Sequence, residues 1–411
     1  MDLQNLRDNY YKLISHLEEN GYSKDYIRKI RCEITRILSN ADARAWTSYR
    51  DIYLEYAEKI NNPKTLSYKL TQLGAIENFD IRGKYPDGQQ RQKIIKRSKY
   101  YLLSDAFKAV IDFYCTAERA RGIKESTIYT ESHIGSSFLF DLQQKGIDSL
   151  EKITEEAVLA EFVSPKQELL RGYASKKSIA AVFKACIPQN PEIFTKLLTF
   201  LPALRESRKN IQYLRPEEVT RLKQALADEK SPLSLRDKAI GTLALYTGLR
   251  CCDIAGLTLN AVDLANDRLR ICQQKTGVPL ELPLTAVVGN SIFDYLQLER
   301  PNTECEHIFV TYRYPHRRLK DVSLGYVSRK LMKAAVVRQT VGDRKGFHLF
   351  RHHMATALLG NDIPQPVISK AMGHTSPDSL EVYLNADFKH LKDCALSIEQ
   401  FPMREGVLGN A

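Results

Sequence analysis

The sequence predicts a mainly α-helical, multidomain protein with one small β-hairpin in its last third. At 411 residues the chain is too long for one ordinary hydrophobic core, so two or three domains are expected. Apolar residues recur at helical spacing along most of the chain. Strand-like alternation appears in one stretch, RLRICQQKTGVPLELPL (268–284), where a Lys-Thr-Gly turn separates two alternating runs.

The N-terminal block, residues 1–85, is predicted to be helical throughout. Leu6, Leu13 and Leu17 share one helical face, and Ile30 and Ile34 share another. A stretch rich in Gly, Pro and charged residues follows, so we expect a domain boundary before residue 98.

Two further blocks follow this boundary. The middle block, residues 98–206, shows helical spacing at Phe107, Val110 and Tyr114. The basic, polar stretch RESRKN then predicts a second linker, and the C-terminal block covers residues 211–411. The hairpin lies in the C-terminal block, where the remaining elements are predicted helices.

Charge suggests an anionic partner. The formal net charge is +11, and the segment from Thr311 to Arg351 holds eleven Lys or Arg residues against Asp321 and Asp343. Such a segment favours a phosphate-facing surface, and the plainer alternative is a solvated helical face. The candidate DNA-binding residues in it are Arg313, Arg317, Arg318, Lys320, Arg344 and Lys345.

Several classes of protein are disfavoured. No apolar run reaches the roughly 20 residues that span a bilayer, and the N-terminus has acidic residues early and no hydrophobic region of a secretory signal, so no membrane partner is expected. The 8 cysteines are scattered without CxxC spacing, as in reduced, cytosolic proteins. We therefore expect a cytoplasmic protein.

Two segments of the C-terminal block offer cations for phosphate chemistry. In TGLRCCD, Gly248 breaks a helix, Arg250 begins the next one, and Asp253 can hold the arginine in orientation. Lys275 lies at the tip of the hairpin, where a flexible finger can bring it to a leaving oxygen. Taken singly, a surface Arg–Asp pair and a solvated turn lysine are the commoner interpretations.

A third segment, HLFRHH, places His348 and Arg351 on one helical face, which suits a phosphate oxygen. His348 and His352 also have the i, i+4 spacing of zinc ligands, but the segment lacks the glutamate of HExxH, and an arginine would repel a dication. We therefore expect no metal site and no cofactor. His352 and His353 are interpreted as structural or solvent-facing.

The fourth segment, GHTSPDSLEVY, holds His374 and Tyr383. Tyrosine is a poor nucleophile at its usual pKa of roughly 10. Arginines and a histidine nearby would stabilise the phenolate and neutralise the phosphate that it attacks. The resulting phosphotyrosine ester conserves the bond energy, so a strand could be rejoined without ATP or metal. Ser376-Pro377 is expected to begin the helix that carries Tyr383.

These segments, in this order, resemble the tyrosine recombinases, the phage-integrase family of site-specific DNA recombinases. The resemblance rests on TGLR, QKTG, HLFRH, GH and the following tyrosine, and it covers about residues 213–395. It implies the tyrosine-recombinase catalytic fold in the C-terminal block and, in the middle block, a helical core-binding domain that closes a clamp around DNA. The N-terminal block is of uncertain role, either accessory DNA binding or protein interaction.

The resemblance also implies residue roles. Arg250 and Arg351 would clamp the scissile phosphate, with Asp253 supporting Arg250, and His374 would donate to a non-bridging oxygen. Lys275 would be the general acid for the leaving 5′-hydroxyl and His348 a base and positioning group. Tyr383 would form the 3′-phosphotyrosine link.

The implied partner is double-stranded DNA, bound by a homotetramer on two sites that is a monomer or weaker oligomer when free. An amphipathic helix over 388–401 would dock on a neighbouring subunit. In a prokaryotic host the protein would associate with the nucleoid, as part of a mobile element. The alternatives are a type IB topoisomerase, which uses nearly the same chemistry, and a catalytically silent DNA-binding relative.

Overall fold

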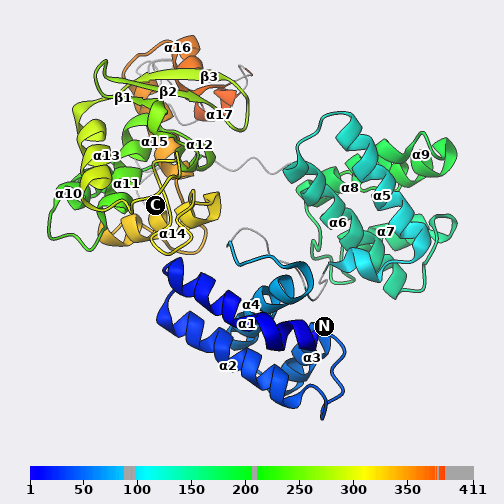
Figure 1. The fold of residues 1–411 in the computed structure, drawn as a ribbon. Helices are drawn as coiled ribbons and strands as arrows, with labels where there is room; N and C mark the ends of the chain where they lie inside the picture. The colour runs from blue at the N-terminus through cyan, green and yellow to red at the C-terminus, as the bar shows by residue number, and fades with distance from the viewer. Residues whose placement is uncertain (88–93, 95–97, 206–210, 375, 377–378, 385–411) are drawn as a thin grey trace, which may run out of the picture. The chain divides into compact units, whose positions relative to one another are not determined.

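The computed structural model describes residues 1–87, 94, 98–205, 211–374, 376 and 379–384, and it is mainly helical with one small sheet, as the sequence predicts (Figure 1). The chain divides into two compact units. One consists of Met1–Leu6, Thr35–Lys84 and Gln90–Arg208, and the other of Arg7–Ile34, Tyr85–Gln89 and Lys209–Ala411. The three-domain division expected from the sequence stays a prediction.

The N-terminal block is helical in its described part, and the apolar faces predicted for it are buried. Leu13, Leu17 and Ile30 are fully buried. The start of α3 follows from capping: Ser48 accepts a hydrogen bond from the Asp51 backbone N–H while the Asp51 carboxylate accepts from that of Ser48. The helices are α1 (Leu3–Glu19), α2 (Lys24–Asn40), α3 (Tyr49–Lys59) and α4 (Pro63–Arg82).

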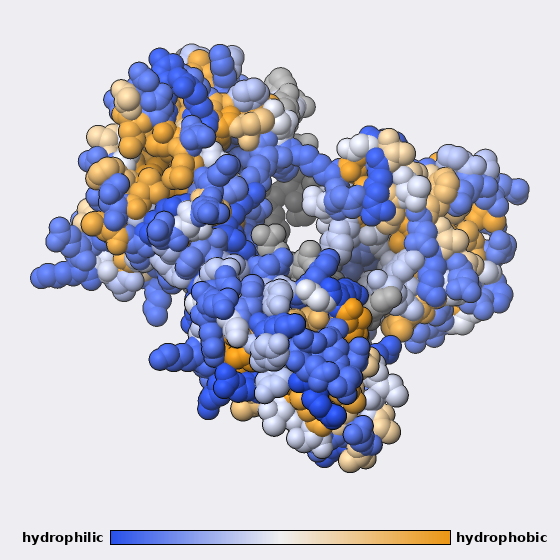
Figure 2. Space-filling model, in the orientation of Figure 1, coloured by the Kyte–Doolittle hydropathy of each residue, from blue (hydrophilic) through white to orange (hydrophobic). Residues whose placement is uncertain are grey.

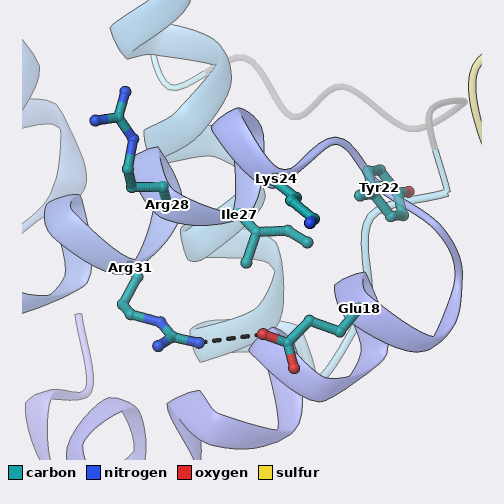
Figure 3. Close-up of a pocket in the computed structure, with 6 residues that line it drawn as sticks. All are labelled: Glu18, Tyr22, Lys24, Ile27, Arg28 and Arg31. Carbon is teal, nitrogen blue, oxygen red and sulfur yellow. Dashed lines mark hydrogen bonds and ion pairs between the residues drawn. The ribbon is translucent and has the colours of Figure 1, made fainter.

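A pocket of about 540 Å³ lies along the α1–α2 hairpin (Figure 3). Arg31 Nη2 forms an ion pair with Glu18 Oε1 at 3.2 Å, and Arg28 Nη2 pairs with Asp25 Oδ1 at 2.9 Å. These charges are therefore compensated within the hairpin. The lining residues are Glu18, Tyr22, Lys24, Ile27, Arg28 and Arg31.

The middle block has a core rich in aromatic side chains. Phe107, Tyr114 and Phe138 are fully buried, and the rings of Phe138 and Phe183 meet edge to face with centroids 6.1 Å apart. Its elements are a 3₁₀ turn η1 (Lys99–Leu102), α5 (Asp105–Ala120), α6 (Glu125–Gln144), η2 (Leu150–Lys152), α7 (Glu155–Phe162), α8 (Tyr173–Cys186) and α9 (Pro191–Thr199).

The C-terminal block is built around one buried helix, α11. Ile240 and Leu243 on it are fully buried. Gly241 brings α11 close to α14, since a Cβ at this position would lie 2.8 Å from Leu331 Cδ2. The helices are α10 (Pro216–Ala227), α11 (Leu235–Thr247), α12 (Cys251–Ala255), η3 (Leu259–Ala261), α13 (Ala286–Leu298), α14 (Asp321–Ala334), α15 (His348–Gly360), α16 (Gln365–Met372) and α17 (Glu381–Leu384).

The predicted hairpin is present and gains a third strand. β2 (Arg268–Cys272) and β3 (Pro279–Pro283) pair antiparallel, and β1 (Val262–Asp263), which the sequence analysis did not predict, pairs with β2. Leu269 and Leu280 face the core, and the exposed Arg268 and Arg270 pair across the strands with Glu281. The hairpin register places the turn around Lys275, as predicted.

Two features of the surface complete the description. Figure 2 shows apolar surface over the part of the molecule that Figure 1 labels α13, where the exposed apolar residues include Val287, Phe293 and Leu298. Over the described residues, no helix is both long and apolar enough to cross a bilayer. The helix predicted over 388–401 lies outside the described residues.

Candidate active site

Arg250 lies at a break between two helices, as the sequence predicts. Gly248 ends α11 in the left-handed conformation, with φ 62°, and Arg250 is the N-cap of α12. The arginine side chain is half-buried and does not cap its own helix. Its Nη1 donates to Oε1 of Gln273 at 2.5 Å.

Gln273 joins three segments of the site, a role that the sequence analysis missed. The side chain is fully buried. Its Oε1 accepts from Arg250 and from Thr276 Oγ1 at 2.8 Å, while its Nε2 donates to the Met372 carbonyl at 3.2 Å. Gln273 directly follows β2 and continues the alternation of Leu269 and Ile271, so a glutamine at an inward position of the hairpin is the signal that could have identified it.

The position of Gln273 explains a glycine in the GH segment. Gly373 ends α16 with φ 62°, a conformation that costs an L-residue about 1–2 kcal/mol. A Cβ on Gly373 would lie 2.2 Å from Gln273 Nε2. Glycine is therefore required here both by the backbone and by the buried amide beside it.

Arg351 is buried and forms no ion pair with a carboxylate in the described structure, although the field of Asp253 favours its charged form. Its Nη1 donates to the Gly248 carbonyl at 2.9 Å and its Nη2 to the Met372 carbonyl at 2.6 Å. Burial and the nearby Arg250 lower the pKa of Arg351 to about 10, so it stays cationic at neutral pH.

The two arginines together form a site suited to an anion. Within the described part of the chain, neither Arg250 nor Arg351 forms an ion pair with a carboxylate, and both donate to neutral oxygens. A buried charge without a counter-ion is costly. An incoming phosphate would supply the missing negative charge and accept from both guanidiniums.

Tyr383 lies at this site, and it is buried. It is 5% exposed and packs among Leu359, Ile368 and Leu380. Burial raises the pKa of Tyr383, against the opposing field of Arg351 and two other arginines, so the side chain is a neutral phenol in the free protein. The helix that carries it begins at Glu381, later than the Ser376-Pro377 start that the sequence predicted; Pro377 is outside the described residues.

His352 contacts Tyr383, although the sequence analysis treated it as structural or solvent-facing. Its Nδ1 is 3.0 Å from the Tyr383 hydroxyl, and both side chains are buried. The i, i+4 spacing from His348 had placed His352 on the face of the site, but it was weighed only as a zinc ligand. In the described residues, no three His, Cys, Asp or Glu side chains gather as a metal site would require.

The two other histidines also border the site. The His374 ring stacks on that of Tyr383, with centroids 6.5 Å apart. Burial and the two arginines lower the pKa of His374 to about 4, so it is neutral at pH 7. His348 is the exposed first residue of α15, and desolvation together with nearby cations, Lys275 among them, lowers the pKa of His348.

Lys275 and Asp253 lie at the hairpin side of the site. Lys275 is exposed in the turn between β2 and β3 and acts on His348 through its field. Asp253 is buried and its Oδ1 accepts from the Gln274 backbone N–H at 2.8 Å, so it anchors the turn instead of bonding the Arg250 guanidinium as expected. The support of Arg250 comes from Gln273.

The candidate DNA-binding residues of the basic segment differ in burial and in their distance from the active site. Arg318 Nη2 donates to Gln274 Oε1 at 3.1 Å, beside the hairpin turn, and Arg344 lies near enough to His348 and His352 to lower the pKa of both. Arg317 is half-buried. The remaining candidates are exposed: Arg313, Lys320 and Lys345.

One family profile matches the part of the chain that holds this site. The profile of the phage integrase family matches residues 212–390. The putative integrase/recombinase y4gC of Sinorhizobium fredii (strain NBRC 101917 / NGR234) is 34% identical over 185 residues, which cover 45% of this chain and 94% of that protein.

Two solved structures share the fold. One is the XerH site-specific recombinase bound to palindromic difH substrate in a post-cleavage complex, with a TM-score of 0.55, 17% identity, and coverage of 84% of this chain and 94% of that one. The other is a lambda integrase tetramer bound to a Holliday junction, with a TM-score of 0.50, 21% identity, and coverage of 77% and 88%. The motif order, the fold and the family profile agree, and the chain belongs to the phage integrase family of tyrosine recombinases.

Proposed function

We propose that the chain cuts and rejoins double-stranded DNA at specific sites through a 3′-phosphotyrosine link on Tyr383. One observation carries the proposal. Two guanidiniums, on Arg250 and Arg351, hydrogen-bond only to neutral oxygens in the described structure and lie beside a buried tyrosine hydroxyl. Such a site is suited to a phosphodiester and holds a nucleophile to attack it.

In this mechanism Arg250 and Arg351 bind the non-bridging oxygens of the scissile phosphate, and His374 donates to one of them. The Tyr383 oxygen bonds to phosphorus as the bond to the 5′-oxygen breaks. Lys275 protonates that leaving oxygen from the hairpin turn, and His348 helps to position the phosphate. Two guanidinium charges offset the negative charge of the non-bridging oxygens in the transition state, so we expect the step to need neither metal nor ATP.

The ester on Tyr383 keeps the energy of the broken bond, so a 5′-hydroxyl from another strand can reverse the attack and complete an exchange. We therefore propose a synaptic homotetramer on two DNA sites. The similarity to a lambda integrase tetramer on a Holliday junction supports this assembly. A DNA substrate also implies action at the nucleoid, in the cytoplasm of a prokaryotic host.

The test uses a pool of suicide duplexes with a randomised core and a nick close to the cleavage site. After cleavage the short strand end diffuses away, so the DNA cannot be rejoined and the enzyme stays covalently attached. Wild type should give a denaturant-resistant protein–DNA complex, and sequencing the trapped DNA identifies a substrate. Tyr383→Phe should bind that substrate with nearly unchanged affinity and give no complex. A complex that persists in Tyr383→Phe, or the lack of one in wild type across the pool, would refute the proposal.

The same substrate distinguishes the topoisomerase alternative. A recombinase should exchange strands between two duplexes that carry the selected sequence. A type IB topoisomerase should relax one supercoiled circle efficiently and leave paired sites unexchanged. A silent DNA-binding relative should bind and do neither.

A further inference from the structure

Tyr383 and His352 form a buried pair that the roles above leave unexplained. The hydroxyl and Nδ1 are 3.0 Å apart, and the two side chains are 5% and 8% exposed. Their ring centroids are 5.3 Å apart with an angle of 55° between the planes, so the contact is made through the ring edge and the hydroxyl. A hydrogen bond at this depth fixes where the phenol oxygen points.

The direction of this hydrogen bond follows from the surrounding groups. The charged side chains that act most strongly on the Tyr383 hydroxyl are Arg250, Arg344 and Arg351, and Arg351 also hydrogen-bonds to it; an arginine can only donate. The His374 ring lies nearly parallel to that of Tyr383, at 15°, so it contacts the face of the phenol. The phenol proton is therefore donated to His352 Nδ1, which must carry a lone pair.

We infer that His352 is a further catalytic residue of this site, which holds the Tyr383 hydroxyl and accepts its proton as the phenol oxygen attacks phosphorus. The inference rests on the proposed function and gives His352 the role of base that the family resemblance implies for His348, because it is His352 Nδ1 that lies 3.0 Å from the Tyr383 hydroxyl. In the forward step the O–H bond of Tyr383 breaks and an N–H bond forms on His352, while the new O–P bond replaces the bond to the 5′-oxygen. In the reverse step His352 returns the proton to the departing phenolate.

The surroundings of His352 suit this task. Burial, with Arg344, His348 and Arg351 nearby, lowers the pKa of His352 to about 4, so the ring is neutral and its lone pair is available at pH 7. A phosphate bound by Arg250 and Arg351 brings a negative charge to the same place. It raises the proton affinity of the ring at the moment when the proton must be taken up.

The other ring nitrogen agrees with this assignment. His352 Nε2 is buried and has no hydrogen-bond partner among the described residues. In the neutral ring with a lone pair on Nδ1, the proton sits on Nε2. The nitrogen without a partner is therefore the one that carries the proton, and Nδ1 faces Tyr383 as an acceptor.

Two substitutions separate holding the hydroxyl from taking the proton. In His352→Asn the side-chain amide lies near the former Nδ1, so the hydrogen bond can persist, but no proton can be accepted. In His352→Phe the ring volume persists without the hydrogen bond. The matched control is His353→Asn, because His353 is the next residue of the same helix and its ring bonds to the Leu214 backbone, away from Tyr383.

The readout is the single-turnover rate of covalent complex formation on the duplex selected with wild type. Both His352 variants should lose about 10²-fold or more in rate, as expected for a missing general base, with DNA affinity nearly unchanged. His353→Asn should stay close to wild type. For His352→Asn the remaining rate should rise about tenfold per pH unit, because solvent hydroxide must take the proton.

A modified substrate shows which proton is missing. Sulfur in place of the bridging 5′-oxygen leaves without protonation, so it should restore the rate of Lys275→Ala. It should not restore that of His352→Asn, since the phenol proton still has no acceptor. Restoration of both variants, or a wild-type rate for His352→Asn, would overturn the inference while leaving the proposed function intact.

A measurement on the protein alone tests the pairing without DNA. In the ¹⁵N-histidine NMR spectrum of the free chain, assigned by the signal that disappears in His352→Asn, His352 should show an unprotonated Nδ1 at pH 7. A protonated Nδ1 would mean that the histidine donates to Tyr383 and would refute the assignment. A failure of the proposed function would appear separately, as wild type without any covalent complex.

Discussion

Replacing Gly373 by alanine should disable the active site through Gln273. The new Cβ would lie 2.2 Å from Gln273 Nε2 and 2.4 Å from its Cδ and Oε1, so the whole amide must move. A glutamine on the surface would move at little cost. Gln273 is fully buried and holds Arg250, Thr276 and the Met372 carbonyl, so it can move only by breaking these bonds.

The expected magnitude has two parts. The left-handed conformation at φ 62° costs alanine about 1–2 kcal/mol, and this part lowers stability alone. The bond from charged Arg250 to Gln273 is worth about 1.5–3 kcal/mol, and breaking it releases the guanidinium from its orientation. If that orientation is needed in the transition state, about 2.7 kcal/mol corresponds to about a 10²-fold slower cleavage.

Urea unfolding and single-turnover cleavage of the selected duplex measure the two parts separately. Gly83→Ala is the matched control, since Gly83 ends α4 with the same φ of 62° and has nothing within 4 Å of its would-be Cβ. This control should lose stability and keep the cleavage rate. In a Gln273→Ala background, Gly373→Ala should slow cleavage much less than it does in wild type. An equal loss of cleavage rate in both backgrounds would refute the argument that the clash acts through Gln273.

Three further outcomes follow from the described charges. Lys320→Gln should flatten the plot of log affinity against log salt by about 0.9 if Lys320 neutralises one DNA phosphate, whereas an unchanged slope would leave Lys320 a solvated residue. Arg338→Gln should instead destabilise the fold by about 3 kcal/mol in urea unfolding, because it leaves the buried Glu218 carboxylate without its partner. The free energy of unfolding should fall as pH is lowered from 6.5 to 4. In this range the two histidines bind protons in the unfolded chain, whereas in the folded chain His352 and His374, with pKa values of about 4, stay neutral. Replacing both rings by Asn should reduce this slope, and an unchanged slope would contradict the assigned pKa shifts.

Much of the fold was predictable because the relevant signals are local. Apolar spacing identified the helices, and the alternation on both sides of Lys275 identified β2 and β3, since burial of one face dictates both patterns. The two-residue β1 was missed because so short a strand leaves no periodic pattern. β1 is a strand only because it pairs with β2, and the sequence of β1 alone does not predict this pairing.

The sequence predicted which candidate residues would lie together better than it predicted their contacts, and their catalytic roles stay a prediction. Motif order selected Arg250, Arg351 and Tyr383, and the structure brings them together. The motif order did not predict that Gln273 would orient Arg250, or that His352 would face the tyrosine, because both contacts join segments far apart in sequence. Asp253 looked like the partner of Arg250 by spacing alone, but the turn of the hairpin offered its carboxylate a backbone N–H instead.

The central claim is that Tyr383 is the nucleophile of a metal-independent phosphoryl transfer to an arginine-bound phosphate. It is tested most directly by trapping the wild-type chain on the selected suicide duplex in the presence of a chelator, digesting the complex, and locating the nucleotide adduct by mass spectrometry. The account predicts a 3′-phosphate ester on Tyr383, with no adduct in Tyr383→Phe and a strongly reduced yield in Arg250→Ala. An adduct on another residue, or a covalent complex that disappears when divalent metal is chelated, would contradict it.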